Sequence, residues 1–433
     1  MKRKVIKKLI EKIEGEAELN YTFDKGKIED VKINFGFYRG IEDILVGKSP
    51  KDALVITPRV CGICNHAHLI AAVRAIENGY GSAGLKIELT GKAKQIREFT
   101  LSCELMQNHI KWLYLTMLPH LEKYLKLDVT GNHAVKAAYF STTITKAMAV
   151  FAGQWPHSSY AVPGGVTCDP TQLDLMQAHS LLEECIRFFE QVVAGIPLET
   201  YLEITSVSSL HTIGGDFGNL LHLLDKSGLA PRGGSHDRFI VFADSFLAAS
   251  GKSIVTSVSP VDARYVEESE QQGSVAKAVT YKNRLYEAGP LARGMVSKEP
   301  IVKNLHKRYK DALITRIFAR IHEIGRLLEA NRNLLSRIRI DEASCVLEED
   351  MKLYEFEGTG AVEAARGSLI HRTTVVDGRI SSYEIITPTQ WNLSHGNEQE
   401  KGVAVKAMVG SGTEEEADFI FRAFDVCSVC TAQ

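Results

Sequence analysis

Alternating polar and apolar residues predict a β-hairpin toward each end of the chain. Near the start, residues 16–23 (EAELNYTF) and 27–35 (KIEDVKINF) alternate on either side of the turn DKGK. Near the end, residues 371–386 (HRTTVVDGRISSYEII) alternate around Asp377 and Gly378, a pair typical of tight turns. We therefore expect small β-elements in the first and last parts of the fold.

A helical repeat of apolar residues dominates the sequence between the two hairpins. Residues 91–126 place most of their apolar side chains at helical spacing, which predicts a long core helix that Pro119 bends or ends. The same spacing predicts further helices over residues 133–152, 170–194 and 303–335.

The composition is that of an ordinary globular chain with a large core. Of its 433 residues, 45% are hydrophobic and 24% are charged. No internal repeat, low-complexity tract or evident linker divides them. We therefore predict a single domain over residues 1–433 of the mainly α (α+β) class, with a large helical bundle core and small hairpins or sheets near both ends.

The balance of charges argues against two classes of partner. Lys and Arg total 51 against 53 Asp and Glu, so no positive excess is present to bind a nucleic acid or an anionic membrane surface. No stretch approaches 18 consecutive apolar residues, and the basic start lacks the apolar run of a signal peptide. We expect no nucleic-acid partner, no transmembrane segment in this chain, and a location in the cytoplasm or at a membrane through partner subunits.

Two C-x-x-C pairs stand out among the eight cysteines. Cys61 and Cys64 lie in RVCGICNHAH, just ahead of an apolar helical run, and Cys427 and Cys430 lie in DVCSVC near the last residue. Eight cysteines are too sparse for a disulfide scaffold in a chain of this length. Two cysteines three positions apart can direct both sulfurs at one point, and a helix N-terminus favours the thiolate. The two pairs can meet only through the tertiary fold.

Spacing alone leaves three uses open for these pairs. A structural zinc site with four cysteines is the commonest, although such sites usually join a small module across a short spacing. A thioredoxin-like dithiol needs only one pair and a βαβ setting, which neither pair has. The third use is a four-thiolate site for a softer, redox-active metal such as nickel or iron.

The rest of the sequence favours the third use. RVCGICNHAH and DVCSVC resemble the two metal-binding motifs of nickel-iron hydrogenase large subunits, R-x-C-G-x-C-x-x-x-H and D-P-C-x-x-C-x-x-H. Five segments between them resemble further motifs of that family, in the family's order: KIEGE, YRGIEDILVGKSPKDA, GQWPHSSYAVPGGV, EAARGSLIH and TPTQWNLS. These motifs run from residue 12 to residue 433, and on them the chain is identified as a member of this family.

The resemblance implies the large-subunit fold and a nickel–iron centre at which H2 is reversibly cleaved into protons and electrons. All four thiolates would bind nickel, and those of Cys64 and Cys430 would also bridge to an iron that carries CN and CO ligands. Electrons would pass to an iron–sulfur small subunit, because this chain has no further cysteine cluster. The resemblance leaves uptake, evolution and H2 sensing for a kinase open. It disfavours the quinone-site relatives of respiratory complexes, which have lost these cysteines.

The resemblance also implies roles for side chains around the centre. Glu14 would be the proton-relay glutamate beside the thiolate of Cys427. Arg366 would extend over the metals and hydrogen-bond a cyanide, with Asp425 as its partner. His68 would hydrogen-bond a bridging thiolate.

Other positions follow the family's motifs less closely. Thr389, following Pro388, would donate a second hydrogen bond to a cyanide. Glu42 and Gln433 would belong to a possible second site for Mg²⁺ or Fe²⁺, at which the family usually has histidine in place of Gln433, so binding there would be weaker. His120 aligns with an aspartate that lies near the arginine in the family, which would alter the charge balance around that arginine.

Overall fold

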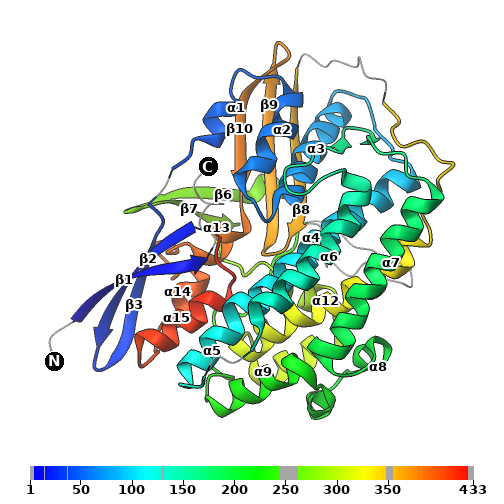
Figure 1. Cartoon of the computed structure of the whole chain (residues 1–433). Helices are drawn as coiled ribbons and strands as arrows, with labels where there is room; N and C mark the ends of the chain where they lie inside the picture. Colours follow the sequence, from blue (N-terminus) through cyan, green and yellow to red (C-terminus); the bar gives the residue numbers. More distant parts are fainter. Residues whose placement is uncertain are drawn as a thin grey trace.

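Helices form most of this computed structural model, and the strands lie toward the left and top of the view in Figure 1. The structure describes residues 4–13, 15–36, 38–128, 131–242, 262–347 and 355–427. Within these residues the predicted fold class is confirmed, because a helical core is combined with small sheets. None of the helices described is both long and apolar enough to cross a lipid bilayer.

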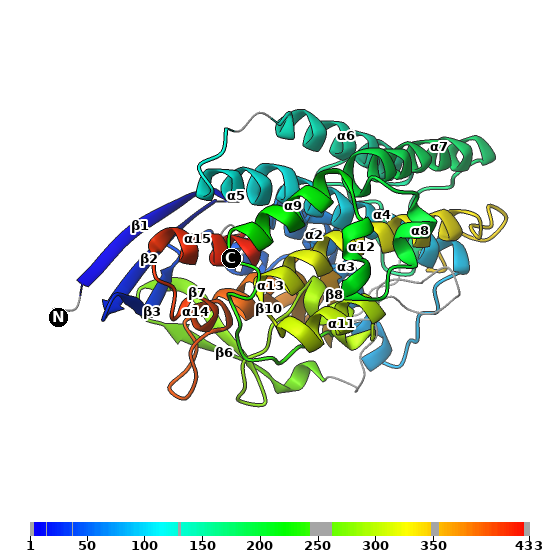
Figure 2. The same cartoon turned by 90° about the horizontal axis from the view of Figure 1, so that it is seen from below.

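Four long helices pack together. They are α4 (Gly91–Lys111), α6 (His133–Ala152), α7 (Gln172–Phe188) and α12 (Leu313–Leu335). Two of them, α6 and α7, lie along one edge of the molecule (Figure 2). Helix α4 packs against α6 and α12, and both of these also contact α7, so the four helices form a bundle (Figures 1 and 2). The helices predicted over residues 133–152 and 170–194 are confirmed, the second of them ending in a π-helical turn.

The helix predicted over residues 91–126 is present as three consecutive pieces. Helix α4 continues into a π-helical turn (Trp112–Met117) and then into α5 (Leu118–Tyr124). Pro119 lies in the first turn of α5, directly after the π-helical turn. It therefore marks the change from π-helical to α-helical turns and does not end the helix.

The single helix predicted over residues 303–335 is wrong, because the structure divides it in two. Helix α11 (Pro300–Tyr309) ends at Lys310, which has a left-handed φ of 58°. Helix α12 then begins, and its first two amides donate to the backbone carbonyls of residues 232 and 230 at 2.7 and 3.1 Å. These tertiary hydrogen bonds interrupt the helix although its apolar spacing continues across the break.

A three-stranded antiparallel sheet lies at the N-terminal end of the chain. It has the order β1 (Lys4–Ile13), β2 (Gly15–Asp24) and β3 (Lys27–Asn34), so the predicted hairpin is confirmed as β2 and β3. Strand β1 was not predicted, because its basic residues obscure the alternation. Figures 1 and 2 show this sheet projecting from one end of the molecule, beside α14 and α15.

A second antiparallel sheet lies in the upper part of the view in Figure 1. It has the order β10 (Arg379–Ile386), β9 (Gly367–Val376) and β8 (Phe356–Ala364). The predicted hairpin is confirmed as β9 and β10, and both of its turn residues, Asp377 and Gly378, have positive φ.

Helix α3 (Asn65–Ser82) lies directly against this second sheet. A Cβ atom at Gly358 would be 2.0 Å from the carbonyl oxygen of Ala75, and one at Gly360 would be 2.0 Å from that of Ala71. Both glycines of β8 are therefore needed for this close packing of strand and helix.

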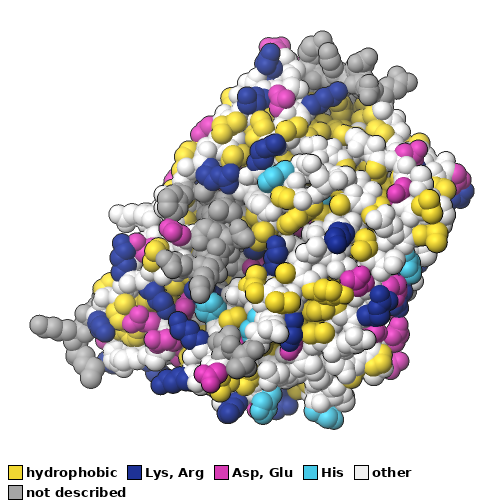
Figure 3. Space-filling view, in the orientation of Figure 1, with side chains coloured by type: hydrophobic (Ala, Val, Ile, Leu, Met, Phe, Trp, Pro, Cys, Tyr) yellow, Lys and Arg dark blue, Asp and Glu magenta, His cyan; other side chains and the backbone are white. Residues whose placement is uncertain are grey.

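The remaining elements are short, and the analysis of the sequence did not find them. They are α1 (Ile41–Leu45), α2 (Pro50–Ile56), β4 (Ala161–Val162), β5 (Gly165–Val166), α8 (Leu198–Leu202), α9 (Gly215–Lys226), β6 (Val266–Gln271), β7 (Ser274–Tyr281), α10 (Pro290–Val296), α13 (Pro388–Leu393), α14 (Val403–Met408) and α15 (Glu414–Ala423). On the face shown in Figure 3, side chains of both charges are intermingled, with hydrophobic side chains between them.

Candidate metal centre

Three of the four predicted ligand cysteines meet in the structure. The Sγ atoms of Cys61, Cys64 and Cys427 lie within 4.8 Å of one another, and those of Cys61 and Cys427 are 3.8 Å apart. All three are at most 5% exposed. Cys430, the fourth, lies outside the described residues. The fold therefore brings together two motifs whose cysteines are up to 366 positions apart.

Cys61 and Cys64 are held at the start of a helix. A single 3₁₀ turn (Thr57–Val60) leads to Cys61, which has an extended backbone. Cys64 is the N-cap residue of α3, so its sulfur lies at the positive end of the helix dipole, which favours the thiolate. Because α3 packs closely against β8, the position of this pair depends on the second sheet.

Cys427 is placed by the end of another helix. Helix α15 starts at an N-cap, Thr413, whose hydroxyl accepts from the N–H of Glu416 at 3.2 Å. Two residues beyond the helix, Asp425 has a left-handed φ of 59°. This turn redirects the chain so that Cys427 enters the protein interior.

Arg366 and Asp425 form a buried ion pair beside the cysteines. Arg366 lies in the turn between β8 and β9, and its Nε donates to the carbonyl oxygen of Asp425 at 2.8 Å. Its Nη2 donates to Asp425 Oδ1 at 3.2 Å. Burial disfavours the charge of Arg366, but Asp425 and the three cysteine sulfurs together raise its pKa well above the ordinary value. The guanidinium is therefore a permanent cation at this site.

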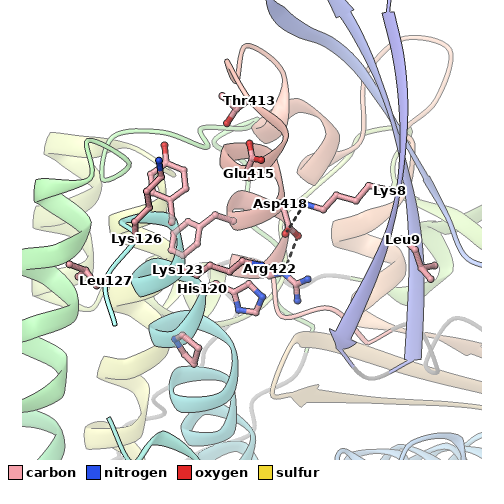
Figure 4. Close-up of a pocket in the computed structure, with 13 residues that line it drawn as sticks. Lys8, Leu9, His120, Lys123, Lys126, Leu127, Thr413, Glu415, Asp418 and Arg422 are labelled. Atoms are coloured by element: carbon pink, nitrogen blue, oxygen red, sulfur yellow. Dashed lines mark hydrogen bonds and ion pairs between the residues drawn. The ribbon is translucent and has the colours of Figure 1, made fainter. Parts of the chain in front are cut away.

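Asn108 of α4 contacts Arg366, whereas His120 does not lie there. Arg366 Nη1 donates to Asn108 Oδ1 at 3.3 Å. His120 instead bonds the carbonyl oxygen of Thr116 at 2.6 Å and lines a groove of about 1180 Å³ between β1, α5 and α15 (Figure 4). The placement predicted for His120 is wrong. Asn108, which does contact Arg366, lies twelve residues before His120 in the same run of helical turns.

A chain of buried polar contacts extends from Asp425 into the helical core. Arg320 Nη1 donates to Asp425 Oδ2 at 2.9 Å and lies 3.2 Å from His109 Nδ1. His109 Nε2 lies 2.8 Å from Glu323, which also pairs with Arg293 at 2.6 Å. Burial, reinforced by the nearby arginines, lowers the pKa of His109 to about 4 although Glu323 opposes the shift. His109 is therefore neutral, accepting from Arg320 and donating to Glu323.

The analysis of the sequence missed this network. The sequence feature that could have revealed it is the run RIFARIHE, in which Arg316, Arg320 and Glu323 recur at helical spacing within an apolar helix. A buried helix rarely carries such charges without partners.

Glu104 is a second residue that the sequence analysis missed. It lies on α4, is 1% exposed, and accepts from the backbone N–H of His66 at 2.8 Å and of Ala67 at 3.0 Å. Burial raises the pKa of Glu104 to about 8, although these two N–H groups oppose the rise.

His68 is buried in the first turns of α3 and is part of a line of hydrogen bonds. Its Nδ1 lies 3.1 Å from His371 Nε2, and His371 Nδ1 lies 2.9 Å from the Tyr383 hydroxyl. Burial lowers the pKa of His68 to about 4, although Cys61 opposes the shift. The hydrogen bond expected from His68 to a bridging thiolate stays a prediction.

Pro388 and Thr389 begin helix α13, and both are buried. Thr389 Oγ1 has no hydrogen-bond partner among the described residues, although the residue is only 3% exposed. A buried hydroxyl without a partner is costly, so this one fits an acceptor that the described residues do not supply.

Glu42, Glu14 and Gln433 are the remaining residues predicted from the sequence. Glu42 accepts from the N–H of Ile385 at 2.6 Å, and burial raises its pKa although Lys277 opposes the rise. Glu14 and Gln433, like Cys430, lie outside the described residues. Their roles stay predictions.

Comparison with known proteins identifies the family. A model of the nickel-dependent hydrogenases matches residues 39–124 and 251–432, which is more than half of the chain. The large subunit of the periplasmic [NiFeSe] hydrogenase of Desulfomicrobium baculatum is 25% identical over 92% of this chain and 88% of its own. Sulfhydrogenase 1 subunit alpha of Pyrococcus furiosus is 25% identical over 98% of this chain and 96% of its own.

The fold agrees with these matches. The reduced Ni-Fe-Se hydrogenase of D. vulgaris Hildenborough has a chain that superimposes with a TM-score of 0.83, at 24% identity and over the full length of both chains. The prediction of a nickel–iron hydrogenase large subunit, made from the motifs, is confirmed. Because the family model matches more than half of its residues, the chain belongs to the nickel-dependent hydrogenases.

Proposed function

We propose that this chain is the catalytic subunit that cleaves H2 reversibly into protons and electrons, and that Cys61, Cys64, Cys427 and Cys430 hold its nickel–iron centre. The observation that carries this assignment is the convergence of the three described sulfurs within 4.8 Å. Thiolates are soft ligands that suit nickel and iron. When bound, such a centre supplies a Lewis-acidic and redox-active site for the heterolysis of H2.

The surrounding side chains fit iron-bound diatomic ligands such as CN and CO. Within the described part of the chain, the hydrogen bonds of Arg366 to Asp425 and Asn108 use three of its five N–H donors, which leaves two that can serve a ligand. The hydroxyl of Thr389, which lacks a partner among the described residues, is a second donor of this kind. We assign both side chains to cyanide, with Pro388 fixing the start of the helix that carries Thr389.

Protons must leave a buried site through a group that can accept them, because bulk water is excluded. We assign this role to Glu14, on its motif alone. Arg366 is poorly suited to it, because its pKa is raised well above the ordinary value.

Large subunits of hydrogenases work with small subunits, and we propose an iron–sulfur small subunit as the partner here. A hollow of about 360 Å³ beside Arg366 is lined by Ile63, Asn108, Leu115 and Val426, among others. Leu115 is 45% exposed at its rim. An electron acceptor must approach the cysteines closely, and we place the small subunit over this hollow.

Two further assignments stay predictions. Glu42, together with Gln433, is proposed for a second site for Mg²⁺ or Fe²⁺. The complex is placed in the cytoplasm, or at a membrane through partner subunits, although the relative from Desulfomicrobium baculatum is named as periplasmic.

The assignment of the metal centre is tested by replacing one described cysteine. The Cys61→Ser variant, expressed with its native partners, is expected to lose nickel by elemental analysis and to lose H2/D2 exchange. Cys103→Ser is the matched control, because Cys103 is equally buried but lies on α4 outside the cluster. Wild-type protein that contains one zinc per chain and no nickel would contradict the proposal.

A further inference from the structure

Strand β1 is the free edge of the N-terminal sheet. The order of this sheet is β1, β2, β3, so β1 pairs with β2 on one side only. At the other edge, β3 contacts α14 and β7, and the amide of Val275 donates to the carbonyl oxygen of Phe35 just beyond β3. Within the described part of the chain, β1 therefore presents alternate N–H and C=O groups that no neighbouring strand binds.

The groove between β1, α5 and α15, which we call the outer groove, runs along this edge (Figure 4). Its volume is about 1180 Å³. Lys8 and Leu9 of β1 both line it, whereas none of the described residues of β2 or β3 does. Successive residues of a strand point to opposite faces of the sheet, so a groove lined by two of them reaches the edge of the strand. An extended segment in this groove would meet the unpaired backbone groups of β1.

The outer groove carries an excess of positive charge. Its lining has four Lys and Arg residues against two Asp and Glu residues. Lys123 and Lys126, on the side opposite Lys8 in Figure 4, are exposed and form no ion pair with any residue that the structure describes. One of the two acids, Asp418, is already shared by Lys8 and Arg422, at 3.2 and 2.9 Å. The groove is therefore complementary to an acidic partner.

Exposed apolar side chains adjoin these lysines. Val5 and Leu9, on one face of β1, are 67% and 53% exposed, and Leu127 on the opposite wall is 40% exposed. Lysines by themselves are the ordinary protection of an edge strand against pairing. Together with exposed apolar side chains, they give an edge that selects its partner, because an acidic strand is attracted and a basic one is repelled.

We propose that β1 and the outer groove bind an acidic, extended segment of a partner subunit, which adds to the sheet as a fourth strand. Main-chain hydrogen bonds to β1 hold the segment, and its acidic side chains pair with Lys123 and Lys126. The outer groove shares Arg422 with the hollow beside Arg366, so a subunit placed over that hollow can reach the groove. The inference rests on the proposed function only for the existence of a partner subunit.

Hydrogen exchange tests the added strand. The amides of residues 4–10 are compared, at single-residue resolution, between the full-length chain purified alone and the same chain in the complex with its native partners. Every second amide of this stretch, which β2 does not bind, is expected to exchange at least about tenfold more slowly in the complex. Equal rates in the two samples, or protection without this alternation, would overturn the proposal.

Charge reversal tests the acidic character of the segment. Lys123→Glu combined with Lys126→Glu is expected to raise the dissociation constant of the complex by about tenfold, because two attractions become repulsions. The matched control combines Lys303→Glu and Lys307→Glu, two exposed lysines of α11. Equal weakening in the control would overturn the proposal.

A third measurement separates a protein partner from a lipid surface. If the Lys123 and Lys126 double variant loses binding to vesicles of anionic phospholipid while its complex stays as tight as the wild type, the groove binds a membrane surface and the proposal is overturned. Nickel content and H2/D2 exchange are expected to be unchanged in this variant. A wild-type chain without nickel would contradict the proposed function, while the protection of β1 would still decide the role of the groove.

Discussion

The two cysteine motifs are held in place by different forces. The first motif is fixed by packing and by backbone hydrogen bonds: α3 lies against the glycines of β8, and α4 binds the loop through Glu104 and Asn108. Cys427, in the second motif, follows a left-handed residue, Asp425, and its surroundings are fixed by buried charges from other elements.

We call the surroundings of Cys61 and Cys64 the packed half of the site and those of Cys427 the charged half. The difference between them indicates which mutations each half tolerates. Close packing is insensitive to pH but cannot accept added volume. A buried ion pair accepts small changes of shape, but removing one partner leaves an uncompensated charge in a medium of low polarity. The two halves are therefore expected to fail under different mutations, in the order given below.

The largest effect is expected from Asp425→Ala, which removes the shared partner of Arg366 and Arg320. Two buried guanidinium groups then lack their carboxylate, which lowers the free energy of unfolding by about 3–5 kcal/mol. Urea unfolding of the metal-free chain measures the loss. Glu384→Gln is the control, because its ion pair with Arg372 is exposed; an equal loss there would show that burial of the charge is not the cause.

Gly360→Ala is expected to push α3 away from the sheet and to lower the free energy of unfolding by about 1–3 kcal/mol. Its Cβ would lie 2.0 Å from the carbonyl oxygen of Ala71 and 2.4 Å from the amide nitrogen of Ala75, and neither backbone can move alone. The same unfolding experiment measures the change, and nickel content reports whether the first motif has shifted. Gly81→Ala, on α3 with open space around it, should be neutral or slightly stabilising.

A titration isolates one group of the network beside Asp425 when the wild type is compared with a variant that lacks His109. Because the folded pKa of His109 is about 4 and an exposed histidine has a pKa near 6.5, the unfolded chain binds the extra proton between these values. The free energy of unfolding therefore falls as the pH drops from 7 to 5, by about 2 kcal/mol for this group. In His109→Gln that part of the fall should disappear, since the amide still accepts from Arg320 and donates to Glu323.

The smallest effect is expected from Lys8→Met, at the outer groove of Figure 4. Lys8 pairs with Asp418 at 3.2 Å, and both partners retain access to solvent. Such a pair contributes less than about 1 kcal/mol. Nickel content and unfolding should match the wild type; a loss of nickel would extend the charged half of the site as far as β1.

Several elements could be predicted because their patterns are local. The helices over residues 133–152 and 170–194 and the hairpin turn at Asp377 and Gly378 follow from spacing and turn residues alone. Strand β1 was missed, since lysines interrupt its alternation. The break at Lys310 was missed because tertiary hydrogen bonds, which no periodicity records, determine it.

The same distinction applies to the site. The cysteine motifs could be found in the sequence because a metal ligand requires a particular residue type at a particular spacing. The network from Asp425 to Glu323 could not be found, since charged residues on a helix are usually exposed and only burial shows that these need partners.

The sequence by itself determined the family, the two cysteine motifs, and the main helices and hairpins, because each depends on residue identity and on short-range spacing. Only the tertiary structure decided which side chains surround the cysteines. Asn108 and Arg366 are 258 positions apart, and Asp425 and Arg320 are 105 positions apart. Contacts over such separations depend on how helices and sheets pack, and packing is a property of the whole folded chain.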